Sequence, residues 1–177
     1  TMPKATICAV RGRAGGGGAE IAASADMIFA SPDSVFCQPE VALGIIPGGG
    51  GTARLSRTVG RRRTMEIVLG GEDVDAATAE KWGWINRVVA DPVAHALALA
   101  RRIASFPPNA VAAGKRLVLM AETGIEENLV SEGTVFNEQL SDPRARAAMD
   151  AFLSRGGQTR EGELRLGDLA GEINELS

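Results

Sequence analysis

The sequence predicts an α/β fold, and three observations support this. Short β-rich runs alternate with glycine-rich turns and helix-like stretches up to about residue 90. After Asp91 the pattern changes to helices alone. Of the 177 residues, 45% are hydrophobic and 23% are charged, which is typical of a folded chain with one sizeable core.

In residues 1–90, turn residues separate the predicted strands and helices. The β-rich runs cover residues 6–10, 27–30, 35–38 and 85–89. The helix-like stretches cover residues 17–25, 52–59, 61–69 and 76–82. Asp75 is the predicted N-cap of the last helix and Gly83 its stop. We therefore expect residues 1–90 to form one α/β region.

We expect residues 91–155 to form a helical region. Asp91 is an N-cap followed by proline, and one predicted buried face then consists of Val93, Ala96, Leu97, Ala100, Ile103 and Ala104. Two prolines precede the next helix, over residues 110–121, and a further helix carries Ile125, Leu129, Phe136 and Leu140. The last helix follows Asp142 and has an apolar stripe of Ala145, Ala148, Met149, Phe152 and Leu153. The composition of residues 156–177 predicts a polar, loosely held tail.

Composition excludes several classes of partner and site. A formal net charge of −3, 4% aromatic residues and no tyrosine argue against binding to nucleic acid or to anionic membranes. The longest uncharged run is too short and too rich in glycine to span a bilayer, and the first residues do not resemble an export signal. Cys8 and Cys37 form no Cys-x-x-Cys pair, so we expect reduced thiols and a cytoplasmic location. The single histidine, His95, argues against metal sites with several His ligands, and its position predicts a solvent-facing side chain.

Two glycine-rich loops each accompany a glutamate. Gly15 to Gly18 follow a predicted strand and open the helix that carries Glu20. The unsatisfied N–H groups of such a helix start can stabilise an oxygen that becomes negative. Taken alone, this loop is more simply a turn, with Glu20 complementing the helix dipole. A second glutamate, Glu40, precedes the segment Ile46-Pro47-Gly48-Gly49-Gly50-Gly51, and the two pairs together predict a site.

The second loop also matches a loose dinucleotide-binding pattern at Gly48, Gly50 and Ala53. The required preceding strand is replaced by Pro47 and an irregular loop, which makes this a poor alternative.

Together these motifs resemble the enoyl-CoA hydratase/isomerase (crotonase) family over residues 4–155. The resemblance rests on Ala9-Val10-Arg11-Gly12, Gly15 to Glu20, residues 26–30, Gln38-Pro39-Glu40, residues 44–51 and Arg54-Leu55. It implies a crotonase-like ββα spiral core followed by a helical oligomerisation region. It also implies that this chain corresponds to the C-terminal portion of the family, whose N-terminal segment supplies the other oxyanion-hole N–H.

The resemblance implies hydration of an enoyl-CoA thioester. Glu20 and Glu40 would hold and activate the water, and the backbone N–H of Gly17 would form half of an oxyanion hole. We expect Gly16, Pro39, Gly48 and Phe152 to contact the substrate. No metal or cofactor is expected, since the coenzyme A thioester is itself the substrate. Homotrimers, often paired into hexamers, are the implied assembly.

Two alternatives to hydration remain open. The first is isomerase, decarboxylase or hydrolase chemistry on other acyl-CoAs. The second is a non-catalytic relative that only assembles. Clp-type proteases have a related spiral fold, but they need a Ser-His pair that this chain does not offer.

Arginines cluster in residues 54–63: the five are Arg54, Arg57, Arg61, Arg62 and Arg63. They could face CoA phosphates or a neighbouring subunit, but a solvated helix face is the simpler interpretation.

Overall fold

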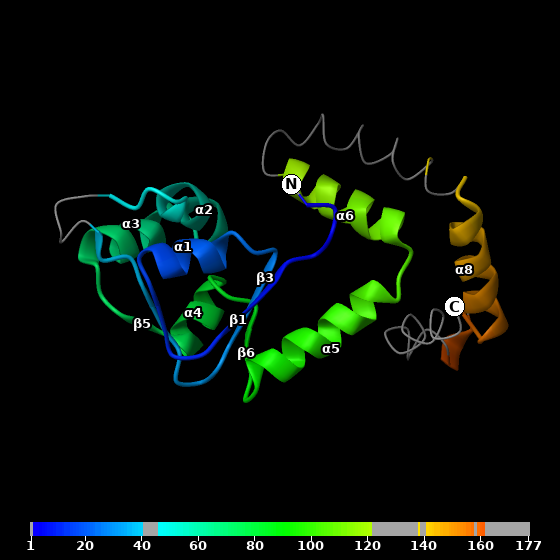
Figure 1. The fold of residues 1–177 in the computed structure, drawn as a ribbon, viewed down its shortest axis with the longest axis horizontal. Helices are drawn as coiled ribbons and strands as arrows, with labels where there is room; N and C mark the ends of the chain where they lie inside the picture. The colour runs from blue at the N-terminus through cyan, green and yellow to red at the C-terminus, as the bar shows by residue number, and fades with distance from the viewer. Residues whose placement is uncertain (1, 41–45, 122–137, 139–140, 158, 162–177) are drawn as a thin grey trace. The chain divides into compact units, whose positions relative to one another are not determined.

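The computed structural model describes residues 2–40, 46–121, 138, 141–157 and 159–161 (Figure 1). The chain divides into two compact units, residues 6–99 and residues 1–5 with 100–177. The helix predicted to carry Ile125, Leu129, Phe136 and Leu140 lies outside the described residues, as does the tail beyond residue 161. The predicted regions 1–90, 91–155 and 156–177 stay a prediction.

Two small sheets organise the unit of residues 6–99. The first has the order β1-β3-β6, formed by β1 (Ile7–Val10), β3 (Met27–Ala30) and β6 (Arg87–Val88), and both of its pairings are parallel. The second has the order β2-β4-β5, formed by β2 (Arg13–Gly15), β4 (Val35–Cys37) and β5 (Val74–Asp75). There β2 pairs with β4 in parallel and β4 with β5 antiparallel. The predicted α/β class is confirmed.

The chain passes from one sheet to the other at Gly12. This residue has a φ of 75°, a conformation that glycine adopts without steric cost, and only two residues separate the end of β1 from the start of β2. Helix α1 (Gly17–Ala23) then follows β2 directly, so that β1, β2 and α1 form a ββα unit. α1 ends two residues earlier than predicted, because Asp26 N–H donates to the carbonyl of Thr6 and starts the pairing with β1.

Three more helices cover this unit: α2 (Gly51–Thr58), α3 (Arg61–Gly70) and α4 (Ala76–Trp82). The predicted cap of α4 is confirmed, since Asp75 Oδ1 accepts from Thr78 N at 2.7 Å, and Gly83 ends the helix with a φ of 79°. Phe36, Leu55 and Ile67 are almost fully buried in the core. The ring of Phe36 packs on Trp84 with centroids 5.4 Å apart.

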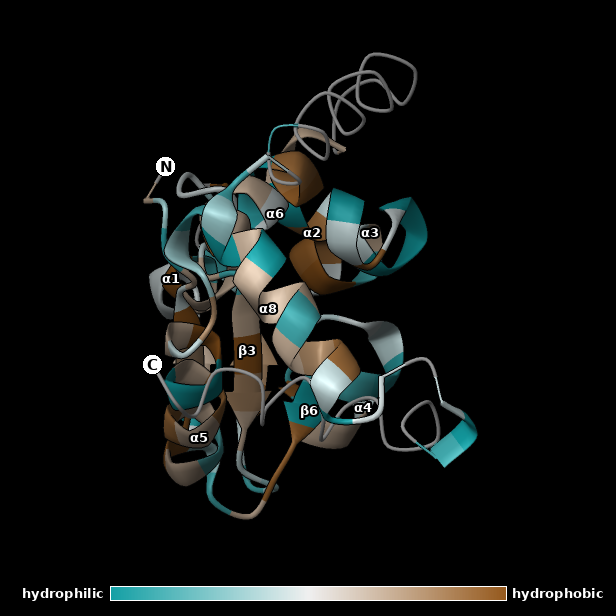
Figure 2. Cartoon of the chain, turned by 90° about the vertical axis from the view of Figure 1, so that its right-hand side faces the viewer, coloured by the Kyte–Doolittle hydropathy of each residue, from teal (hydrophilic) through white to brown (hydrophobic). Residues whose placement is uncertain are grey.

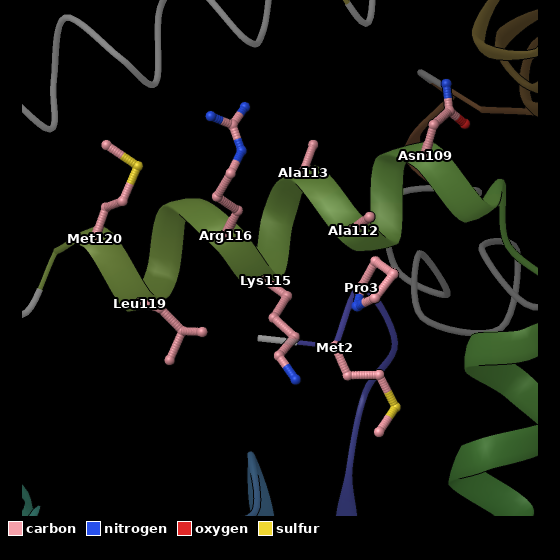
Figure 3. A pocket seen from close by; sticks show the side chains of 9 residues that line it. All are labelled: Met2, Pro3, Asn109, Ala112, Ala113, Lys115, Arg116, Leu119 and Met120. Atoms are coloured by element: carbon pink, nitrogen blue, oxygen red, sulfur yellow. The ribbon is translucent and has the colours of Figure 1, made fainter.

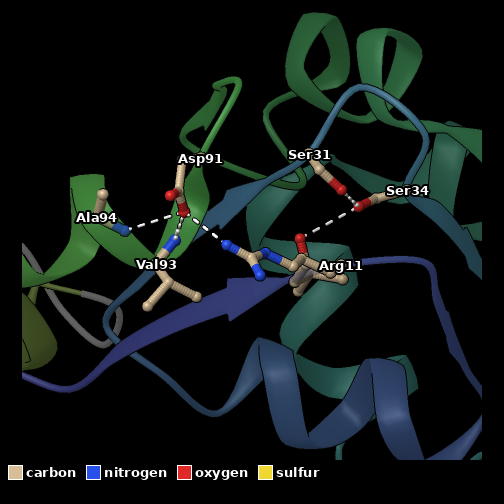
Figure 4. Close-up of polar contacts among 7 residues, drawn as sticks. Arg11, Ser31, Ser34, Asp91, Val93 and Ala94 are labelled. Atoms are coloured by element: carbon tan, nitrogen blue, oxygen red, sulfur yellow. Dashed lines mark hydrogen bonds and ion pairs between the residues drawn. The ribbon is translucent and has the colours of Figure 1, made fainter.

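Helix α5 (Pro92–Ala104) begins at a polar junction (Figure 4). Asp91 Oδ1 accepts from the backbone N–H groups of Val93 and Ala94, each at 3.1 Å, and from Arg11 Nη2 at 2.7 Å. These donors, Ala94 first, hold the pKa of Asp91 below its usual value. Nearby, Ser34 Oγ donates to the carbonyl of Val10 and shares a hydrogen bond with Ser31.

One expectation about α5 is wrong and another holds only in part. His95 does not face solvent: it is half-buried, and its ring meets that of Phe29 at 63°, with centroids 4.4 Å apart. The predicted buried face is buried only in part within this chain: Val93 and Leu97 are 40% and 50% exposed, whereas Ala96 and Ile103 are half-buried. Helical periodicity identifies the apolar side of a helix, but it does not supply the surface that covers it.

In the second unit, α6 (Pro108–Met120) and α8 (Pro143–Ser154) are the described helices. Hydrophobic and hydrophilic residues alternate along α8 (Figure 2). Its stripe is also partly exposed, with Met149 at 41% and Leu153 at 50%. A groove of about 630 Å³ lies between α6 and the start of the chain; Met2, Pro3, Asn109, Lys115 and Leu119 contribute to its lining (Figure 3). None of the described helices is both long and apolar enough to cross a membrane.

Candidate active site

The Glu20 carboxylate binds the start of a different helix from its own. It is the fourth residue of α1, only 9% exposed, and its Oε1 accepts from Gly49 N at 2.6 Å and from Gly51 N at 2.8 Å. Gly51 is the first residue of α2, so its N–H has no partner within that helix. Glu20 therefore caps α2, where the helix dipole favours a negative group.

The backbone of the second glycine loop fits closely around this carboxylate. A Cβ placed on Gly49 would lie 2.7 Å from Glu20 Oε2, so only glycine is accommodated there without movement. Gly50 has a φ of 108°, which turns the chain so that the N–H groups on both sides of it face Glu20. Among the described residues, none donates a hydrogen bond to Oε2 of Glu20.

Glu40 follows β4 and is also buried, at 8% exposure. Its partner is the amide of Gln38, a residue only 1% exposed. With the amide oriented to satisfy its neighbours, its nitrogen donates to Oε2 at 3.0 Å and to Oε1 at 3.1 Å. A Cβ on Gly16 would lie 3.1 Å from Oε1, so Gly16 packs directly against this carboxylate.

The two glutamates share neighbours. Gly16 contacts Glu40 and is the N-cap of α1, the helix that carries Glu20. The Gln38 amide, which contacts Glu40, also lies 2.9 Å from the position of a Cβ on Gly51, which donates to Glu20. The structure thus brings Glu20, Glu40 and Gly16 together around the two glycine loops predicted from the sequence.

The remaining predicted site residues differ in their surroundings. Gly17 is exposed at the first position of α1, a Cβ on it would meet no atom within 4 Å, and its N–H donates to none of the described groups. Pro39 is half-buried beside Glu40, and Gly48 is exposed next to Gly49. Phe152 lies in the other unit, on α8, where its ring packs against Gly157. The roles of all these residues stay predictions.

Sequence reasoning did not assign a role to Gln38 or a specific contact to Arg54. Arg54 Nη1 donates to the carbonyl of Gly49 at 2.7 Å. All five clustered arginines are exposed, as predicted, but Arg63 also lies over the Trp82 ring at 5.7 Å. In the sequence, only the position of Arg54, four residues after Gly50, indicates its contact with Gly49. Helical side chains lean toward the N-terminus of their own helix.

A bidentate ion pair supports β2, the strand that leads into Gly16. Arg13 Nη1 and Nη2 donate to the two carboxylate oxygens of Asp73 at 2.5 and 2.6 Å. This pairing raises the pKa of Arg13 and lowers that of Asp73. Burial raises the pKa of the Cys8 thiol. Within the described residues, no cluster of His, Cys, Asp and Glu is arranged to hold a metal ion.

Comparisons with known proteins identify relatives of this chain. A curated relative from Rhizobium meliloti named "Probable enoyl-CoA hydratase" is 40% identical over 155 residues, covering 86% of this chain and 60% of its own length. The mitochondrial enoyl-CoA hydratase of Pongo abelii is 37% identical over 157 residues, covering 87% and 54%. This chain thus spans about 60% of the length of such relatives.

Solved structures show the same fold. The crystal structure of enoyl-CoA hydratase from Bacillus anthracis superposes with a TM-score of 0.84 at 28% identity, covering 88% of this chain and 61% of that one. The sequence model of the enoyl-CoA hydratase/isomerase family matches residues 1–161. The predicted crotonase-type core is therefore confirmed, and this chain belongs to the enoyl-CoA hydratase/isomerase family.

Proposed function

We propose that the protein containing this chain hydrates an enoyl-CoA thioester, adding water across the 2,3 double bond. The observation that carries this proposal is the pair of buried glutamates, Glu20 and Glu40, each held by its own donors. Two carboxyl groups that share neighbours can bind one water between them. The family membership of the chain supports the substrate class.

In the proposed reaction one glutamate is ionised and the other protonated. The oxygen of the bound water forms a bond to C3 while the ionised glutamate accepts a proton from that water. The π electrons of the double bond move toward the thioester, whose oxygen becomes an enolate oxygen. The protonated glutamate then delivers its proton to C2. Glu20 suits this work because Oε1 is engaged by two backbone N–H groups, and Oε2 remains to face the water.

The negative charge on the thioester oxygen needs donors at the right place. The N–H of Gly17 would supply one, since the space above this residue is open and the N–H binds none of the described groups. Donors of this kind each accelerate such reactions by about 10²- to 10³-fold. Gly16, Pro39, Gly48 and Phe152 are the further residues that we propose to contact the substrate.

Hydration is tested by the ultraviolet absorbance of the substrate. The natural protein that contains this chain, at its natural length, is mixed with 2-butenoyl-CoA and with longer enoyl-CoA thioesters. Hydration removes the conjugated double bond, so the absorbance falls and the 3-hydroxyacyl product appears by mass spectrometry. Conversion of a 3-enoyl to a 2-enoyl thioester without hydration would instead identify an isomerase. Binding of these thioesters without any turnover would identify a non-catalytic relative.

We propose further that the protein assembles into homotrimers or hexamers. Support comes from large apolar side chains that are exposed in this chain, among them Leu97, Val118, Met149 and Leu153. Light scattering should give a trimeric or hexameric mass at micromolar concentration, and a folded monomer would contradict the proposal. The cytoplasmic location stays a prediction, and the name of the Pongo abelii relative places that protein in mitochondria.

A further inference from the structure

Arg54 lies over the loop that precedes its own helix. It is the fourth residue of α2, and side chains on a helix lean toward its N-terminus. Its Nη1 donates a hydrogen bond of 2.7 Å to the carbonyl of Gly49. A donor that carries a full charge makes this a strong hydrogen bond, although the side chain is exposed.

The stability of α2 does not account for this placement. The N-terminal end of a helix is the positive end of its dipole, where a cation is disfavoured. The first turn of α2 contains no acidic residue that could pair with Arg54. The guanidinium is instead stabilised by the Gly49 carbonyl, whose own residue also donates to Glu20.

The peptide group held by Arg54 lies between the two N–H groups that bind Glu20. The Gly49 carbonyl belongs to the peptide between residues 49 and 50, and the two donors belong to the peptides immediately before and after it. Fixing the middle peptide restricts rotation of both neighbours, because consecutive peptide planes share their Cα atoms. Four glycines in a row, Gly48 to Gly51, would otherwise leave this segment free to adopt many conformations.

Gly50 gives a second indication that the loop is fitted to the guanidinium. An ideal Cβ on Gly50 would collide with Arg54 Nη1. The left-handed backbone at this residue and the absence of a side chain therefore leave the space that Arg54 occupies.

We propose that Arg54 is a positioning residue for the Glu20 carboxylate, acting through the loop Gly49 to Gly51. This inference rests on the proposed hydration, because Glu20 is one of the two groups that would activate water. Displacing the loop would move Glu20 away from its working position, and small displacements of a catalytic group can reduce turnover by about tenfold to a hundredfold. If Arg54 acts only through this loop, its loss should change substrate binding little.

The test uses Arg54→Gln in the natural protein that contains this chain. We expect kcat for hydration to fall about tenfold while KM changes less than about threefold. The matched control is Arg57→Gln, which removes the same charge from the same helix. Among the described residues, Arg57 donates only to the Ala53 carbonyl of its own helix, at 3.4 Å, and its replacement should leave kcat unchanged. Arg54→Lys keeps a charged donor and should recover part of the lost turnover.

A second measurement needs no substrate. Hydrogen exchange of the Gly49 and Gly51 amides, followed by NMR or mass spectrometry, should be faster in Arg54→Gln than in Arg57→Gln. Equal exchange in the two variants, or equal kcat, would overturn the proposal. If the unmodified protein fails to hydrate any enoyl-CoA, the proposed function is wrong, whereas the exchange rates still decide whether Arg54 holds the loop. If Arg54→Gln does not fold, the same comparison is made between Arg54→Lys and Arg57→Lys.

Discussion

Gly49 and Glu20 are in direct contact: the Gly49 N–H donates to Oε1 at 2.6 Å, and a Cβ on Gly49 would lie 2.7 Å from Oε2. A methyl group on Gly49 would therefore have to displace the carboxylate. We expect Gly49→Ala to lower kcat for hydration by about 10- to 100-fold, because Glu20 loses its position. Gly70→Ala is the control, since a Cβ there meets no atom within 4 Å. Equal activity of the two variants would show that Glu20 is not sensitive to this loop.

The effects of replacing Glu20 and Glu40 on kcat should not multiply. If Glu20 and Glu40 share one water, replacing either with Gln keeps the shape but removes a proton acceptor, and should cost about 10²- to 10⁴-fold in kcat. The double variant should cost far less than the product of the two single effects. Glu66→Gln, which removes an exposed carboxylate from α3, is the control. Near-normal hydration by Glu20→Gln, with Glu40→Gln inactive, would leave Glu20 only its role as a cap of α2.

Phe36 should be a main contributor to stability in the unit of residues 6–99. It is fully buried and packs on Trp84, so Phe36→Ala should lower the free energy of unfolding by about 3–5 kcal/mol through lost burial and a new cavity. Leu69→Ala removes a side chain that is 64% exposed and should have a much smaller effect. Urea denaturation followed by tryptophan fluorescence measures both. Similar losses in the two variants would contradict the described core.

The pKa of the Asp142 carboxyl should depend on Arg144. The side-chain hydrogen bonds from Arg144 are the main reason that the pKa of Asp142 is lowered from 3.8 to about 2. Because this pKa is depressed, the ionised carboxylate stabilises the folded state above pH 3.8, and this contribution is lost as the pH falls through about 2. Arg144→Gln should raise the pKa of Asp142 toward 3.8, measured by carboxyl carbon NMR. Arg146→Gln, which removes the partner of Asp150, should leave it unchanged.

The strands that the sequence predicted well are those with a continuous apolar run, such as β1 and β3. The strands that it did not predict, β2 and β5, have three and two residues, and they exist because each pairs with β4. No local pattern distinguishes such a strand from a turn. The cap at Asp75 was predictable because its donor, the N–H of Thr78, is only three residues away.

The sequence identified residues of the candidate site, but it did not predict the contacts between them. Glu20 and Glu40 stood out because each accompanies a glycine-rich loop. That Glu20 caps α2 rather than complementing its own helix depends on how α1 and the second loop pack, which sequence spacing does not reveal. The same holds for Gln38, whose amide contacts the Glu40 carboxylate just after β4.

The hydrogen bonds to Glu20 also bear on how the protein folds. They join residues 29 and 31 positions apart, so the intervening chain must be closed into a loop before either bond can form. Contacts of such high sequence separation form more slowly than the turns of α1 and α2, which are local. During refolding, helical circular dichroism should therefore recover before hydration activity does. The surroundings of Glu20 would be among the last parts of this unit to form, and truncated nascent chains that end before Gly49 would carry its carboxylate without the two backbone N–H donors.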